Sequence, residues 1–547
     1  MKFTFKNLGI FEKETTIELG DFTIICGDNN TGKTYASYAI FGFLNIWNHI
    51  ISIWNHIISF DIPEDKLQKL YDNGVIQLDL NDFAQTIDSK VLAELSANYT
   101  DILPRILNFH EDFFKTTIFK VCSYSDNYLN NSFESVIKTK SGKEILRFDK
   151  QKGSNVLQIS LLIEDENVAL LSFSQIRHFA KPNLARALLE NHFPTPFIIS
   201  SERTGVSLFY RELDINKNIL VERLQNQDKQ LEISNYLGMI EEVTSRYALP
   251  IKKGIDFVRD IFDIHSKKKS QLIKEHPEFL EIIQEIVGGE YKVENNQILF
   301  AFEEQKIPLY MASSAVKSML ELYFYIISIA KKGDILIIDE PELNLHPANQ
   351  RKLARFLARL VKVGIKVFIT THSDYLIKEL NNLIMLSDDF KYKDEVLKEL
   401  GYSSEDNLAP SYIKAYVADK KTLSLAPITE YGIEVDSFDK EIGAINRAFN
   451  EITLAKGILK KMSIEIFRKI VNLDDHKINI EIDPKGYVLS PFLSNNKELH
   501  INTIANWIFG YLFREWSEAD FPKLLVSGNR TSFPKQQILI LAKVLTY

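Results

Sequence analysis

The sequence predicts an α/β protein whose parallel sheet carries its functional residues at the carboxyl ends of the strands. Three segments predict this fold: an apolar run that ends in a glycine-rich loop, a second that ends in two acidic residues, and a third that ends in a histidine. Buried parallel strands are continuous apolar runs, and α/β sheets bind ligands beyond the carboxyl ends of such strands. The three segments therefore predict one site at one edge of a sheet.

The first segment, Phe22–Cys26, leads into a P-loop of the form G-x-x-x-x-G-K-T, and a helix is expected from about Tyr35. The loop consists of Gly27, Asp28, Asn29, Asn30, Thr31, Gly32, Lys33 and Thr34. Its glycines let backbone N–H groups turn toward phosphates, and the helix N-terminus favours negative charge. We expect Lys33 to reach the β- and γ-phosphates and Thr34 to offer a hydroxyl to Mg²⁺. The loop predicts a site for ATP or a related nucleotide.

The second segment is the apolar run that ends at Asp339 and Glu340. We expect Asp339 to hold Mg²⁺ through its water shell, and Glu340 to orient and deprotonate the attacking water. Pro341 ends the strand, and Pro347 predicts the first turn of the next helix.

The third segment, Val367–Thr371, ends at His372, which we expect to contact the γ-phosphate. The alternative is an ordinary turn histidine, but the strand–helix–strand spacing after Asp339 favours a catalytic role.

This order of motifs resembles the ABC-type ATPases, in particular their SMC-like and OLD-like branch. The resemblance implies a signature helix shortly before the Asp-Glu strand, where this chain has Ser313-Ser314 followed by Ala315 in place of the usual glycine. In this family the signature reaches the nucleotide of the other subunit. The resemblance therefore implies a homodimer or higher oligomer around ATP and Mg²⁺, although Ala315 puts a methyl group near that contact. The alternative is that the two serines only cap a helix.

Two further segments fit this branch. The start, Phe5–Leu19, looks like its opening hairpin, and Phe197–Gly205 resembles a strand-to-loop element of bacterial defence ATPases. Within it, Arg203 faces a phosphate or pairs with Glu202. Roughly 300 residues separate Lys33 from Asp339, far more than in transporter ATPases of this class, so the chain is not expected to be a transporter motor. A long coiled coil is not expected either, because the sequence has no sustained heptads.

A chain of 547 residues predicts several domains, because single cores rarely grow beyond about 250–300 residues. We expect a P-loop ABC-type ATPase core with inserted β and helical regions and an α-rich C-terminal cap. The expected divisions are an ATPase lobe over 1–60 and 291–390, a β-rich insertion with core strands over 61–205, a helical arm over 206–290, and a helical, partner-binding C-terminal region over 391–547. In 115–175 and 207–287 we expect hairpins and helices, respectively.

Composition predicts a cytoplasmic protein without a membrane span. Only Cys26 and Cys122 are present, which fits a reducing compartment. A tandem heptad, 46–52 and 53–59, interrupts the most apolar stretch with polar residues on one face, so we expect an amphipathic helix there. The net charge of −8 gives no overall footprint for nucleic acid, but the helical arm carries Lys252-Lys253 and Lys267–Lys269. These lysines form either a solvated face or a nucleic-acid contact.

The tail offers no convincing nuclease site. Its acidic groups, Asp388-Asp389, Asp474-Asp475, Glu481 and Asp483, lack the arrangement of a Toprim nuclease. Its histidines, His476 and His500, are too isolated for an HNH site. The chain looks most like the PtuA-type ATPases of Septu antiphage systems, some of them retron-associated, with the PARIS-type ATPases similar. That resemblance implies a sensor or regulator of a separate HNH-type nuclease. The alternatives are a DNA-repair or chromosome-maintenance ATPase, and an OLD-like nuclease with a site in the tail.

Overall fold

The structure is a computed structural model that describes most of the first 435 residues and short parts of the rest. It describes residues 1–53, 61–122, 127–130, 132–139, 142–162, 172–190, 192–211, 247–266, 269–295, 297–435, 444–452, 481–482, 487–489 and 499–500. The chain divides into two compact units, Met1–Val435 and Asp436–Tyr547. All elements described below lie in the first unit unless stated otherwise.

The central sheet has six strands in the order β16-β15-β3-β14-β13-β9. The strands are β3 (Phe22–Cys26), β9 (Pro196–Ile199), β13 (Ile335–Asp339), β14 (Lys366–Thr371), β15 (Ile413–Asp419) and β16 (Thr422–Leu425). All neighbours pair in parallel except β15 and β16, which form an antiparallel hairpin at one edge. Every residue of β3 and β13 is buried. The three apolar runs of the sequence are therefore adjacent strands, and the predicted parallel α/β sheet is confirmed.

Helix α1 (Lys33–Ile53) begins inside the P-loop and contacts β9, β13 and β14. Its first heptad has the predicted two faces: the apolar side chains are buried, His49 and Ser52 are exposed, and Asn48 is half-buried, like Asn45 just before the heptad. The second heptad lies almost entirely outside the described residues. In the part of the chain that is described, no helix is long and apolar enough to cross a membrane.

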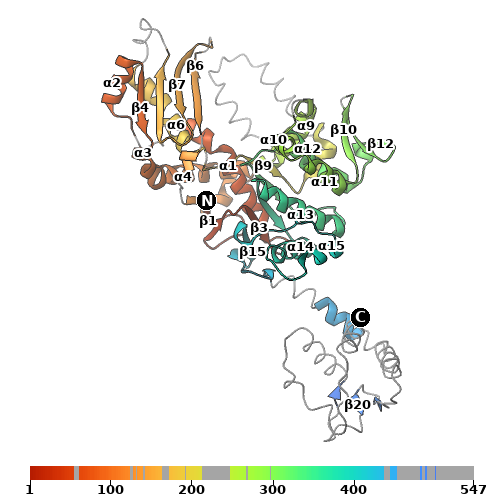
Figure 1. The fold of residues 1–547 in the computed structure, drawn as a ribbon. Coiled ribbons are helices and arrows are strands. Elements are labelled where there is room, and N and C mark those ends of the chain that lie inside the picture. Colours follow the sequence, from red (N-terminus) through yellow and green to blue (C-terminus); the bar gives the residue numbers. More distant parts are fainter. Residues whose placement is uncertain are drawn as a thin grey trace. The chain divides into compact units, whose positions relative to one another are not determined.

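Helix α13 (Pro347–Lys362) precedes β14 in the sequence, and α14 (Asp374–Met385) follows it. The two helices pack against each other, and α13 also contacts β14. Figure 1 shows these two helices and α15 (Lys393–Leu400) beside the strands labelled β3 and β15. Pro347 is the first residue of α13, as the sequence predicts. The side chain of His346 caps the helix.

The opening hairpin consists of β1 (Lys2–Lys6) and β2 (Thr15–Glu18), which pair antiparallel. Strand β5 (Ile118–Cys122) joins the free edge of β1 and completes a three-stranded sheet. Phe3 of β1 lies 5.8 Å from Phe43 of α1 and 5.7 Å from Phe119 of β5, measured between ring centroids. This aromatic packing joins the hairpin to the helix that follows the P-loop.

A four-stranded antiparallel sheet, β4-β8-β7-β6, occupies much of the stretch between α1 and β9. Its strands are β4 (Val75–Asp79), β6 (Phe133–Lys138), β7 (Glu144–Lys150) and β8 (Val156–Leu161). The hairpins turn at Gly142 and Gly153, whose φ angles of 86° and 83° suit glycine, within the range 115–175 where the sequence predicts hairpins. This stretch is also helical in α2 (Glu64–Asn73), α3 (Asn81–Thr86), α4 (Leu92–Ile106) and α6 (Phe173–Leu189).

Between residues 247 and 328, the described part of the chain forms helices and a small sheet ahead of β13. The helices are α9 (Leu249–Ser266), α10 (Gln271–Glu275), α11 (Glu278–Val287) and α12 (Ser314–Ser328), and the strands are β10 (Glu290–Glu294), β11 (Gln297–Phe302) and β12 (Gln305–Pro308). Helix α12 contacts α9, α10 and α11. Pro250 lies in the first turn of α9, where a proline needs no hydrogen-bond donor.

The second unit is described only in short pieces. Residues 444–452 are helical, and β19 (Glu481–Ile482), β20 (Tyr487–Leu489) and β21 (Leu499–His500) pair antiparallel. The acidic groups at 474–476 and Asp483 lie outside the described residues, as do Lys267 and Lys268 of the helical arm.

Candidate functional site

The P-loop connects β3 to α1 and needs its two glycines for steric reasons. Gly27 has φ 146°, and a Cβ atom there would lie 2.5 Å from the carbonyl oxygen of Ala418. Gly32 has φ 91°, and a Cβ atom there would lie 2.9 Å from the side chains of Ile10 and Phe11. Both values are too short for any side chain to fit without a shift of neighbouring atoms. The loop is therefore held closely between β15 and the opening hairpin.

Between the glycines, Asp28, Asn29 and Asn30 are exposed at the tip of the loop. The Thr31 hydroxyl turns inward and donates to the Asp28 carbonyl over 2.7 Å. Asn30 has φ 60°, a left-handed conformation that asparagine tolerates better than most residues. The tip is thus a short turn whose backbone is available to a ligand.

Lys33 is only 6% exposed, although it carries an ammonium group. Its Nζ donates to the carbonyls of Gly27 and Asp28 at 2.8 and 2.7 Å. Burial lowers the pKa of Lys33, while the nearby carboxylates of Glu340 and Asp339 oppose that shift. The ammonium is therefore held inside the loop, facing the two acidic residues that the sequence assigns to the same site.

Asp339 is the last residue of β13 and is 1% exposed. The Thr34 hydroxyl of α1 donates to its Oδ2 over 3.0 Å, and the Thr370 hydroxyl of β14 donates to its Oδ1. Burial raises the pKa of Asp339, and both hydroxyl donors oppose this effect. A carboxylate and a hydroxyl side by side at a P-loop are oxygen ligands of the kind that Mg²⁺ prefers. Thr34 and Asp339 would therefore hold this ion.

Glu340 and His372 meet just beyond the ends of β13 and β14. The distance between His372 Nδ1 and Glu340 Oε1 is 3.3 Å, and that between His372 Nδ1 and Glu342 Oε1 is 3.4 Å. Glu342 is 5% exposed and accepts hydrogen bonds from the Thr371 hydroxyl at 2.8 Å and from the His372 backbone N–H at 2.9 Å. Two carboxylates therefore lie next to Nδ1 of the imidazole, and Glu342 also holds the backbone of His372.

Sequence reasoning missed Glu342. The signal was present in the sequence, because Glu342 lies two residues after Glu340 and shortly before the helix start at Pro347. Its contact with His372, however, depends on the pairing of β13 with β14, which the sequence alone does not position to the ångström.

Arg203 does neither of the two things that the sequence suggests for it. It is 2% exposed, and its guanidinium donates to the backbone carbonyls of Ser200, Asp339 and Glu340 rather than to Glu202. Glu202 instead accepts a hydrogen bond of 3.0 Å from the hydroxyl of Tyr38 on α1. The Arg203 side chain is therefore buried behind Asp339 and Glu340, where it hydrogen-bonds to the backbone.

The predicted signature serines lie at the start of α12. Ser313 is the N-cap, and its hydroxyl accepts the N–H of Val316 at 3.2 Å. Ser313 and Ser314 are exposed, while Ala315 is half-buried. The cap is observed, and no described contact joins these serines to the P-loop of the same chain. A signature that serves the other subunit would have this property as well.

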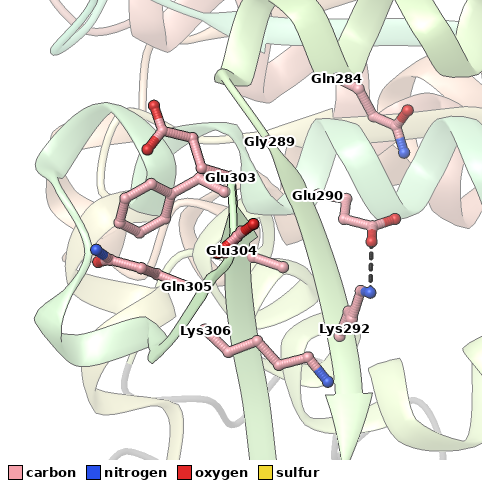
Figure 2. Close-up of a pocket in the computed structure, with 10 residues that line it drawn as sticks. Gln284, Gly289, Glu290, Lys292, Glu303, Glu304, Gln305 and Lys306 are labelled. Atoms are coloured by element: carbon pink, nitrogen blue, oxygen red, sulfur yellow. Dashed lines mark ion pairs between the residues drawn. The ribbon is translucent and has the colours of Figure 1, made fainter.

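A surface hollow of about 480 Å³ lies elsewhere, on the β10–β12 sheet. Figure 2 shows that Glu290, Lys292, Glu303 and Glu304 line it, with an ion pair of 2.6 Å between Glu290 and Lys292. None of the predicted site residues contributes to this hollow. The chemistry at the ends of β3, β13 and β14 is therefore the stronger candidate site.

Helix α12 carries a buried carboxyl group close to this chemistry. Glu321 is 1% exposed, and neither of its oxygens has a hydrogen-bond partner in the described structure. Burial raises the pKa of Glu321 to about 8, against the opposing charge of Arg203. Gly254 of α9 faces it, since a Cβ atom there would lie 3.3 Å from Glu321 Oε2. The glycine leaves room for the carboxyl group between α9 and α12.

The parallel sheet, the glycine-rich loop and the Lys33–Thr34–Asp339 arrangement together define a P-loop nucleoside triphosphatase. The chain belongs to the family described as the AAA ATPase domain, whose model matches residues 1–377. The matched residues include the P-loop, Asp339, Glu340 and His372. The family establishes the chain as an ATPase-domain protein, and ATP is accordingly its nucleotide.

Other comparisons give more distant similarities. An uncharacterized protein of Methanocaldococcus jannaschii is 24% identical over 148 residues, a match that spans 27% of this chain and only 18% of that protein. The SMC head domain of Thermotoga maritima is 11% identical, with 78% of this chain and 98% of that chain covered and a TM-score of 0.25. The Smc head domain of Pyrococcus furiosus, solved with the C-terminal domain of ScpA, is 12% identical, with 82% and 98% covered and a TM-score of 0.26.

The buried Glu321 predicts a specific dependence of stability on pH. The folded carboxyl group keeps its proton up to about pH 8, whereas an unfolded one releases it near its ordinary value of 4.5. The folded state thus binds one more proton between these values, and stability falls as pH rises through this window. We expect Glu321→Gln to match the wild-type melting temperature near pH 5 and to exceed it at pH 8.5.

Thermal melts of both proteins at the two pH values measure this effect. Glu281→Gln, at an exposed position of α11, is the matched control and should leave both melting temperatures unchanged. A Glu321→Gln variant that melts below the wild type at pH 8.5 would show that the carboxyl is ionised and stabilising there.

Proposed function

We propose that the chain hydrolyses ATP with Mg²⁺ at the edge of the central sheet, with a defined role for each residue. Lys33 and the P-loop N–H groups bind the phosphates, Thr34 and Asp339 hold Mg²⁺, Glu340 deprotonates the attacking water, and His372 contacts the γ-phosphate. The observation that carries this proposal is the convergence of three strand ends. It is supported by the Thr34–Asp339 hydrogen bond of 3.0 Å and the His372–Glu340 distance of 3.3 Å.

We further propose that two chains close around ATP. Ser313 and Ser314 support this because they are exposed at the N-terminus of a 15-residue helix, where N–H groups favour an anion. Tyr310 and Met311, just before them, are 68% and 65% exposed, which leaves apolar surface beside the serines. A second subunit would cover this surface and bring its nucleotide to the serines.

The finer proposal is that the ATPase regulates a separate HNH-type nuclease in cytoplasmic antiphage defence. Its support is the resemblance of the ATPase motifs, and of the strand-to-loop element Phe197–Gly205, to the defence ATPases. Nucleic-acid contact through the helical arm is part of this proposal. Lys252 and Lys253 are half-buried in α9, so only parts of these side chains are available at the surface.

Substitution of Glu340 tests the hydrolytic assignment. We expect Glu340→Gln to keep ATP binding but to lower turnover by about 100-fold or more, because the amide cannot take a proton from water. It should also accumulate an ATP-bound dimer, measured by size-exclusion chromatography with light scattering. Lys33→Ala is the control and should lose ATP binding and the dimer together, because it removes the ammonium from the loop. Wild-type turnover in Glu340→Gln would refute the role of Glu340.

The nuclease partner is tested by incubating the purified chain alone with DNA and RNA, ATP, and Mg²⁺ or Mn²⁺. We expect no cleavage while ATP is hydrolysed, because the proposal assigns cleavage to another protein. Cleavage that disappears in Asp483→Ala would contradict the proposal and place an active site in the tail. Turnover stimulated by DNA, with no nuclease partner recovered, would instead favour a DNA-maintenance ATPase.

A further inference from the structure

The backbone of Glu340 has an uncommon conformation at the point where the proposed chemistry takes place. Its φ is 53°, in the left-handed region that residues with a Cβ atom rarely adopt. Such a conformation costs free energy and persists only where surrounding contacts hold it. The contacts that hold Glu340 therefore decide where its carboxylate lies.

On one side, β14 holds the Glu340 backbone N–H. This N–H donates to the Thr370 carbonyl over 3.0 Å and to the Thr370 hydroxyl over 3.2 Å. These bonds fix the peptide unit that precedes the Glu340 Cα atom. The following peptide unit is held by its carbonyl, which accepts the Leu343 backbone N–H over 3.0 Å and a second donor from Arg203.

On the other side, Arg203 binds the two carbonyls that flank the Glu340 Cα atom. Its Nη1 donates to the Asp339 carbonyl over 2.8 Å, and its Nη2 donates to the Glu340 carbonyl over 2.6 Å. The φ and ψ angles of Glu340 set the relative orientation of these two carbonyls. A planar guanidinium with two donors fixes that orientation, which a single-point donor would not do.

The position of Arg203 is itself well determined. Its Nη1 also donates to the Ser200 carbonyl over 3.1 Å, and the guanidinium is shielded from water. Burial lowers the pKa of Arg203, but the nearby carboxylates of Glu342, Asp339 and Glu340 oppose this shift. An arginine remains protonated under such conditions.

Neighbours of Arg203 anchor the same helical segment, 203–211, independently of its side chain. The Asn344 amide donates to the Thr204 hydroxyl over 3.0 Å, and the Ser207 hydroxyl donates to the Lys317 carbonyl of α12 over 3.0 Å. A substitution at Arg203 should therefore change the support of Glu340 without releasing the segment.

We propose that Arg203 is a positioning residue for ATP hydrolysis: its guanidinium holds Glu340 in the left-handed conformation from which the Glu340 carboxylate meets His372. The proposal rests on the proposed role of Glu340 in deprotonating water. Arg203 does not contact the nucleotide, because its donors are directed to backbone carbonyls and it is buried behind the strand end. Its effect should appear in kcat and not in ATP affinity.

Arg203→Lys tests this directly, since it keeps the charge but loses the two-pronged geometry. We expect kcat to fall by roughly 100-fold, the effect of a misplacement of about 1 Å, while the Kd for ATP stays within about twofold. Arg203→Gln is the second variant, because a neutral amide is accommodated even if a lysine ammonium is not. Ser207→Ala, which removes a neighbouring buried hydrogen bond, is the matched control and should leave kcat within about twofold.

A double-mutant cycle with Glu340→Gln separates positioning from general support of the fold. If Arg203 acts through Glu340, adding Arg203→Lys to Glu340→Gln should lower the residual turnover no further. An equal fall in both backgrounds, unchanged kcat in both Arg203 variants, or a weakened Kd for ATP would overturn the proposal. Wild-type turnover in Glu340→Gln alone would instead refute the proposed role of Glu340, so the two failures are distinguishable.

Discussion

The buried carboxylate of Asp339 is the constraint on which the rest of the site depends. A charged group with 1% exposure costs free energy unless donors compensate the lost water. Two hydroxyls do so, from Thr34 of α1 and Thr370 of β14. Hydrogen bonds to the Asp339 carboxylate thus join the P-loop helix and the histidine strand to the Asp-Glu strand. A bound Mg²⁺ would add positive charge there and strengthen the same arrangement.

From this point the geometry of the neighbouring residues follows. The chain leaves β13 through the left-handed Glu340, which turns its carboxylate toward His372 instead of along the strand. Two residues later, the Glu342 carboxylate accepts hydrogen bonds from the Thr371 hydroxyl and the His372 backbone N–H at the end of β14. Arg203, which begins the helical segment 203–211 after β9, supports this turn. Three segments that are separate in the sequence therefore position one imidazole and one carboxylate.

The sequence predicts the part of this site that lies on strand ends. Lys33, Thr34, Asp339, Glu340 and His372 follow apolar runs, and neighbouring parallel strands bring their carboxyl ends to one edge. The helix start at Pro347 is also predictable, because the proline marks it locally, whereas α1 begins at Lys33, two residues before the start near Tyr35 that the sequence predicts. The positions of these residues are predictable because each depends on short-range pattern or on the general geometry of parallel sheets.

The remainder depends on contacts between distant segments, which patterns do not encode. Arg203 bonds to carbonyls 136 and 137 residues away, and Tyr38 bonds to Glu202 across 164 residues. In the sequence, Glu321 is a polar residue in a largely apolar helix, and nothing there indicates that it is fully buried beside α9. The pairing of β15 with β3, which closes one side of the P-loop at Ala418, is likewise a product of the whole fold.

The most direct test of the central claim is the metal affinity of the ATP-loaded protein, measured by electron paramagnetic resonance with Mn²⁺ in place of Mg²⁺. We expect Asp339→Asn to weaken Mn²⁺ binding by at least about tenfold, because it removes a metal-holding carboxylate; metal-free ATP binding, which depends on the P-loop, should persist. Unchanged Mn²⁺ affinity in Asp339→Asn would contradict the claim that this carboxylate joins the P-loop, the metal and the hydrolytic strand.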